Sequence, residues 1–255
     1  MSYREGGYRR SGWIGAVVAI VLVAWFFGPS LNRAGERARV STPEGFETEM
    51  LSDPKNAPML KPMKETHPEE MRAFAEQGAQ HIREGATPDQ MTAYNRQFLM
   101  GASRRQIERL ARAPHPDLVA VTQASARVME KLRATNVATC GAFAAAGMLD
   151  TEGLASDLRQ AVNDLNATRW RAAAAGRDHP QAPPAQVTAA DAQALAAGMR
   201  QDGLGESDVQ LFLNSDDVTG APPKSQCDIA YHMYRVMLTL PEGPGDRLMR
   251  WTFGP

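Results

Sequence analysis

The chain has 255 residues, of which 43% are hydrophobic and 22% are charged. This length suits one domain or two small ones, and the composition is ordinary for a globular protein. It excludes a wholly disordered chain, a collagen-like repeat and a protein with many membrane spans. The formal net charge is −1, but residues 1–40 carry six arginines against two glutamates. The remainder is therefore net acidic, which argues against nucleic-acid binding.

Residues 12–28 form an apolar segment without a charged side chain. At 1.5 Å per residue a helix of this segment is about 25 Å long, at the short end for a transmembrane helix. Trp13 and Trp25 stand near its ends, where the lipid headgroups would lie. A cleaved signal peptide is the alternative, but no small-residue cleavage site follows closely. We therefore predict a transmembrane signal anchor at 12–28, preceded by a short basic tail at 1–11.

Small residues repeat at a spacing of four within this segment. Gly12 and Ala16 form one such pair, and Gly15 and Ala19 form a second on a neighbouring face. Such pairs let membrane helices approach closely, so they predict a homodimer through the transmembrane helix. Chance is the alternative explanation, because the chain is rich in alanine.

The orientation of the anchor and the state of the two cysteines are linked. Arginines flank the span on both sides, so the positive-inside rule gives no preference. A short tail before the span and a large domain after it is the usual layout of a signal anchor with its tail inside. Cys140 and Cys227 are the only cysteines, and an even number in an exported chain predicts a disulfide. We therefore expect a single-pass protein of the bacterial inner membrane with its domain in the periplasm. A cytosolic domain with reduced cysteines is the alternative.

Residues 29–66 contain five prolines among many polar residues. Proline removes a backbone donor and disfavours helix at the preceding residue. We therefore expect a mostly extended tether that holds the domain away from the membrane. The segment also carries apolar residues that would let it lie along the domain surface: Met50, Leu51, Met59, Leu60 and Met63.

Residues 67–255 show repeated start and stop signals of helices and are expected to form a single domain. Thr87 and Gln90 make a capping box with a proline at the first helical position. Gly101 is interpreted as the end of that helix, with a short helix following over 103–113. No segment alternates between apolar and polar residues for long, so strands should contribute little. The expected fold is an all-α, irregular bundle of seven or eight helices, two of them joined by Cys140 and Cys227.

A search for catalytic motifs is negative. The chain contains no nucleophile elbow, phosphate-binding loop, dinucleotide fingerprint or zinc-protease motif. His67 and two other histidines precede proline and are interpreted as turn or helix-cap residues. His81 and Glu84 stand three residues apart on an expected helix, so both could face one ligand. A solvated helix face explains the same pair, and we expect no metal and no cofactor.

Two further segments are candidate interaction surfaces. Arg105, Arg109 and Arg112 would share one face of a helix, where they could meet anionic lipid headgroups or an acidic partner. Trp251 and Phe253 lie in an apolar C-terminal segment. Such a segment either docks on the core of its own domain or is left exposed for a partner.

The function that the sequence favours is non-enzymatic. Because a membrane anchor stands beside a domain without catalytic motifs, we expect a scaffold or accessory subunit of an envelope protein complex. Its expected partners are the inner membrane and other envelope proteins, and no nucleic acid. The alternative is an envelope enzyme or ligand-binding protein whose site is built from dispersed residues.

Overall fold

The computed structural model describes residues 20–22, 34–54, 56–150, 153–181, 186–214, 218 and 220–254. Within these ranges the chain forms twelve α-helices and two strands of three residues each. The helices are α1 (Ala34–Val40), α2 (Pro43–Ser52), α3 (Ala57–Thr66), α4 (Pro68–Arg83), α5 (Pro88–Ala111), α6 (His115–Thr135), α7 (Val137–Ala146), α8 (Ser156–Asp178), α9 (Ala189–Gln201), α10 (Glu206–Leu213), α11 (Pro223–Met237) and α12 (Glu242–Phe253). The helical class is therefore confirmed, with more helices than the seven or eight expected.

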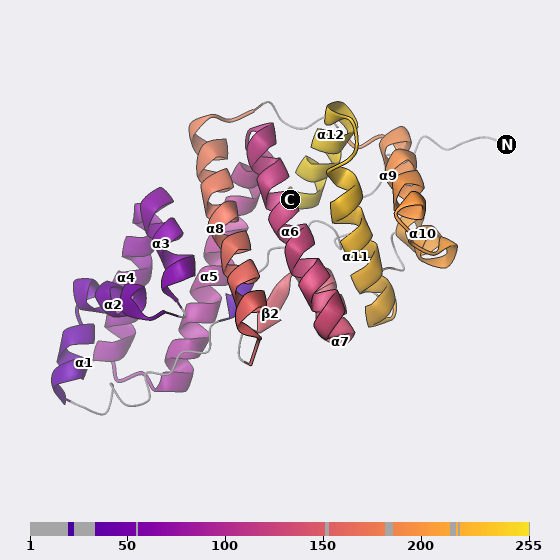
Figure 1. Ribbon diagram of the computed structural model, residues 1–255. Coiled ribbons are helices and arrows are strands. Elements are labelled where there is room, and N and C mark those ends of the chain that lie inside the picture. The colour runs from indigo at the N-terminus through magenta and orange to yellow at the C-terminus, as the bar shows by residue number, and fades with distance from the viewer. Residues whose placement is uncertain are drawn as a thin grey trace.

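The helices pack in a continuous row across the molecule (Figure 1). At one end α2 and α3 pack on α4, and α3 also lies on α8. α8 occupies the middle, between α5 and α6. α6 and α7 pack on α11, and α9 joins α11 to α10 at the other end. One hydrophobic cluster runs through all of these layers.

Residues 34–40, 43–52 and 57–66 form helices, so the expectation of a mostly extended tether is wrong for these residues. Pro43, Pro58 and Pro68 each stand in the first turn of α2, α3 and α4. A missing amide proton removes no intrahelical hydrogen bond at that position, so proline starts these helices instead of breaking them. The inward side chains of the stretch are fully buried: Phe46, Leu60 and Met63. α2 and α3 therefore belong to the packed molecule.

α5 runs without interruption through Gly101, where the sequence predicted a stop. Leu99, Ala102 and Leu110 are buried on either side of this glycine. Their packing outweighs the helix penalty of one glycine, which is about 1 kcal/mol. The start of α5 is as expected, because Thr87 caps the helix and the Gln90 side chain accepts from the Thr87 amide at 2.8 Å.

The two cysteines are joined. Cys140 on α7 and Cys227 on α11 form a disulfide with a Cα–Cα distance of 5.2 Å. Both residues are fully buried. Gly141, next to the bond, packs directly on the backbone of Pro223 at the start of α11. The disulfide thus fixes the contact between two helices that pack closely along their lengths.

Strand β1 (Ile20–Leu22) pairs in parallel with β2 (Met148–Asp150). Ile20 lies opposite Met148, and Leu22 opposite Asp150. These three residues are the only part of the predicted anchor 12–28 that the structure describes, and they form this strand. The rest of the anchor lies outside the described residues, together with the tail 1–11 and the small-residue pairs of the predicted dimer face. Among the described helices, none combines the length and the apolar character that crossing a bilayer requires.

Candidate binding surface

An open groove of about 630 Å³ lies along the outer face of α5. The described residues that line it belong to this helix: Asp89, Thr92, Ala93, Arg96, Gln97, Met100, Gly101 and Arg104. Thr92, Arg96, Met100 and Arg104 follow one another at a spacing of four, so they form a single line along the helix. The groove therefore presents two guanidinium groups on either side of a half-buried methionine.

The two arginines of the groove carry uncompensated charge. Arg96 and Arg104 are exposed, and neither makes an ion pair within the described part of the chain. Eight residues of helix separate their Cα atoms by about 12 Å. Among the described residues that line the groove, Asp89 is the only carboxylate, and about two helical turns separate it from Arg96, the nearer of the two arginines. The surface is thus locally basic on a chain whose net charge is close to zero.

The three arginines that the sequence placed on one helix face do not form a single charged surface. Arg105 donates from Nε to Oε1 of Glu70 on α4 at 3.0 Å, which satisfies its charge. Arg109 is half-buried against α8. Arg112 is exposed just after the end of α5, and its carbonyl accepts from the amide of Gln181 at 3.0 Å. Only Arg112 of the three remains exposed without an ion pair in the described residues.

The apolar C-terminal segment is docked on the core. Phe253 is 4% exposed and stacks on Tyr234 of α11, with 6.3 Å between ring centroids. Trp251 is half-buried against the same hydrophobic cluster. Arg250 of α12 donates a hydrogen bond to the carbonyl of Ala111 at 2.8 Å, which holds α12 on the end of α5. Of the two alternatives for this segment, the structure shows docking, so Phe253 is not available to a partner.

His81 and Glu84 lie near each other on the surface. Nδ1 of His81 is 3.7 Å from Oε2 of Glu84, and the two side chains are 45% and 57% exposed. The His81 ring also packs against Tyr94, with 4.7 Å between centroids. No third ligand joins them, and no group of three or more His, Cys, Asp or Glu side chains suited to a metal occurs among the residues described.

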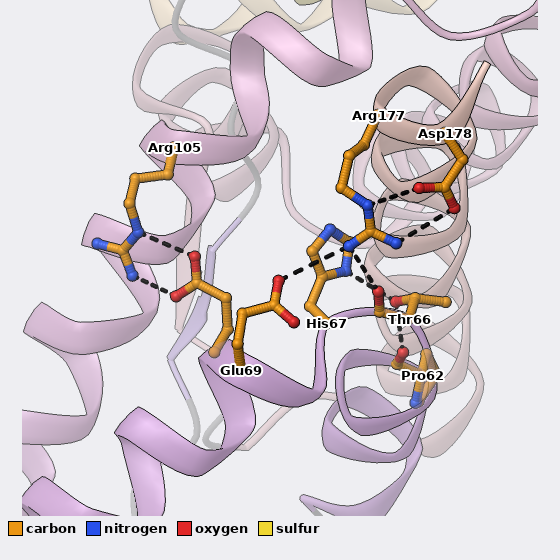
Figure 2. A network of polar contacts seen from close by, with 8 residues as sticks. Pro62, Thr66, His67, Glu69, Arg105, Arg177 and Asp178 are labelled. Carbon is orange, nitrogen blue, oxygen red and sulfur yellow. Dashed lines mark hydrogen bonds and ion pairs between the residues drawn. The ribbon is translucent and has the colours of Figure 1, made fainter. Parts of the chain in front are cut away.

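A network of polar contacts joins α3, α4, α5 and α8 (Figure 2). His67 lies at its centre, between the end of α3 and the start of α4. Arg177 of α8 donates to the carbonyl of Thr66 at 3.1 Å and pairs with Asp178. The hydrogen bonds from Arg177 lower the pKa of Asp178. The sequence marked His67 only as a turn residue before proline, because the pattern carries no information on burial.

An ion pair with a buried carboxylate joins α9 and α12. Asp191 is 3% exposed and accepts two hydrogen bonds from Arg247, at 2.9 and 2.6 Å. Its carboxylate also bonds the amide and hydroxyl of Thr188, which begins α9. The Arg247 hydrogen bonds hold the pKa of Asp191 well below its usual value. This pair ties the C-terminal helix to α9 and has the character of a structural contact.

The chain was also compared with known proteins. No model of a protein family, no curated protein and no solved structure matches it. The candidate surface therefore rests on the geometry of the described residues alone.

Proposed function

We propose that this protein is a membrane-anchored, periplasmic adaptor that binds an acidic segment of another envelope protein without catalysing a reaction. The observation that carries the proposal is the groove on α5, where Arg96 and Arg104 expose two guanidinium groups beside Met100 that make no ion pair with any described residue. Guanidinium forms two parallel hydrogen bonds to a carboxylate, so it recognises acidic side chains well. Methionine adapts its shape to apolar neighbours of those side chains.

The spacing of the two arginines suggests the form of the partner segment. A distance of about 12 Å corresponds to eight residues of helix, or to between three and four residues of an extended strand. The groove is open along the helix axis and lined by small and polar side chains such as Ala93, Gln97 and Gly101. A helix or strand with two carboxylates at that interval would fit both charges at once.

The location of the domain is supported by two features of the chain. The apolar residues 12–28 have the length and flanking tryptophans of a membrane segment, although residues 20–22 pair with β2 in the structure. The disulfide between Cys140 and Cys227 is typical of proteins in oxidising compartments such as the periplasm. An envelope enzyme or ligand-binding protein remains the alternative function, with a site made of dispersed residues.

Photo-crosslinking tests the proposed partner surface. A photoreactive residue at Gln97 in the full chain, activated in the native membrane, should give a discrete crosslinked protein. Arg96→Glu with Arg104→Glu should lower the yield about tenfold or more, because two attractive contacts become repulsive and about 1.4 kcal/mol gives a factor of ten. Arg72→Glu with Arg127→Glu is the matched control, since both arginines are exposed on other helices and make no ion pair among the described residues.

The crosslinking result has clear alternatives. An unchanged yield in the Arg96 and Arg104 variant would refute the groove as the binding surface. Crosslinking to lipid alone, with no protein product, would refute the adaptor proposal and indicate a contact with anionic headgroups. Equal loss in the control variant would show that net charge, and not this groove, determines the association.

Thiol trapping tests the proposed location. Protein taken directly from its membrane into an alkylating reagent should show Cys140 and Cys227 protected, and labelled only after reduction. Two freely labelled thiols would place the domain in a reducing compartment and overturn the periplasmic assignment.

A further inference from the structure

His67 is a fully buried histidine at a corner of the chain. It ends α3 and precedes α4, and its side chain has no exposed surface. Pro68 comes directly after it, which disfavours helical backbone at His67 and so makes the chain turn there. The ring packs against Trp170 of α8, with 5.0 Å between centroids. His67 therefore lies where the N-terminal helices meet the middle of the molecule.

The hydrogen bonds around the ring fix the position of its proton. The hydroxyl of Thr66 donates its single hydrogen to the carbonyl of Pro62 at 2.7 Å (Figure 2). The same oxygen lies 2.9 Å from Nδ1 of His67, so at this contact the hydroxyl must accept and Nδ1 must donate. The neutral ring then carries its hydrogen on Nδ1. Nε2 is left as a bare acceptor, which is buried and has no hydrogen-bond partner among the residues that the structure describes.

Charged groups on three helices surround this ring. They are Glu69 and Glu70 on α4, Arg105 and Arg109 on α5, and Arg177 and Asp178 on α8. Glu70 is paired with Arg105, and Asp178 with Arg177. Burial of the ring, and after it the charge of Arg177, lower the pKa of His67, while Glu69 opposes this in part. The ring is therefore neutral near pH 7.

A second proton would have no place in this arrangement. It would go to Nε2, which has no acceptor within reach, and the new charge would lie beside the guanidinium of Arg177. A buried charge without a partner is strongly unfavourable, so the protonated ring would be stable only after gaining access to water. Access requires that the corner at His67 separate from α8.

We propose that His67 is a proton-sensitive latch, which holds the end of α3 on α8 when neutral and weakens this contact when mild acid protonates it. The contact that opens is the one between Arg177 and the carbonyl of Thr66, at the end of α3. α3 otherwise packs on α8, and its buried side chains Met59, Leu60 and Met63 are apolar members of the hydrophobic cluster. The latch is thus the polar part of that interface.

The first test needs no substitution. In the full chain labelled with ¹⁵N in its histidine rings, NMR at pH 7.5 should show His67 with hydrogen on Nδ1 and none on Nε2. The ring of His67 should still be neutral at pH 6.5, the pKa of an unperturbed histidine. A hydrogen on Nε2, or titration of His67 at pH 6.5 or above, would overturn the proposal.

The second test measures the opening. One additional proton bound in the open state makes opening about tenfold more favourable between pH 7.5 and pH 5.5. Amide hydrogen exchange over residues 57–66, corrected for the intrinsic effect of pH, should rise by that factor in the full chain. His67→Asn should remove this pH dependence, because asparagine supplies a donor close to the place of Nδ1 and does not titrate.

The control is His115→Asn. His115 is half-buried at the start of α6, where Nδ1 contacts Asp246 of α12 at 3.1 Å. This variant should keep the tenfold pH effect over residues 57–66. The latch is refuted if exchange over 57–66 is independent of pH in the parent chain, or if His67→Asn keeps the same dependence. Should His67→Asn not fold, the NMR titration of the parent chain decides alone.

Discussion

Gly176 is the point at which α8 comes closest to α5. A Cβ atom at this position would lie 1.9 Å from the carbonyl oxygen of Arg109 and 2.9 Å from the amide nitrogen of Ala113. Both of these contacts are with backbone, which cannot rotate away as a side chain can. We therefore predict that Gly176→Ala destabilises the protein by forcing the two helices apart.

The size of the loss in stability follows from the distances between this Cβ atom and the backbone of Arg109 and Ala113. Real Cβ atoms essentially never approach other atoms within 3.0 Å, so the backbones must separate by about 1 Å. A gap of that size removes roughly a quarter to a half of the dispersion attraction of each affected contact. Overpacking of this kind costs about 1–3 kcal/mol, and alanine returns at most about 1 kcal/mol of helix propensity. The expected net loss is about 1–2 kcal/mol.

Urea denaturation of the full chain, monitored by circular dichroism, measures this loss. Gly101→Ala is the matched control, because Gly101 is also inside a helix but its added Cβ meets only the flexible end of Arg105 at 3.3 Å. The control should be as stable as the parent or up to about 1 kcal/mol more stable. A Gly176→Ala protein that equals or exceeds the parent in stability, with an unchanged spectrum, would refute the close crossing of α5 and α8.

Two further predictions concern covalent and ionic contacts. Replacing Cys140 and Cys227 by alanine should destabilise the protein by about 4–5 kcal/mol, because the bond closes a loop with a sequence separation of 87 residues; a loss below about 1 kcal/mol in urea would contradict the pairing. Asp191→Asn should lower the urea midpoint at pH 7, since the pKa of Asp191 is depressed by Arg247 and the carboxylate form is the one that stabilises the fold. That stabilisation is present above the usual carboxyl pKa of 3.8 and is lost as the pH falls through the depressed value, so parent and variant should converge in strong acid. A constant difference down to pH 2 would refute this assignment.

Local signals in the sequence predict the helical class well. They fail at positions where tertiary packing determines whether a segment is helical. Thr87 with Gln90 specifies a helix start by hydrogen bonds within four residues, so the sequence alone suffices. Pro58 and Gly101 mislead, because each is compatible with a helix when buried neighbours stabilise it. In the sequence, a proline in the first turn of a helix looks the same as a proline in an extended linker. The two cases differ in the tertiary contacts that the following residues make.

The candidate surface shows the same limit. The sequence drew attention to Arg105 and Arg109, yet the first is neutralised by Glu70 on another helix and the second is half-buried. Arg96 and Arg104 are the exposed pair, and the spacing of eight between them was the signal that could have found them. An arginine of a basic helix keeps a free charge only when no carboxylate from a distant part of the chain pairs with it.

The bond between Cys140 and Cys227 makes a closed covalent ring of the chain from α7 to α11. α8, α9 and α10 all lie within this ring. A protease that cuts once anywhere between the two cysteines would open the ring without releasing a fragment, and the nicked protein would still migrate as one molecule until a reductant is added. Damage to this part of the chain is therefore invisible in a non-reducing gel, and the nicked molecule keeps every helix tethered to its neighbours.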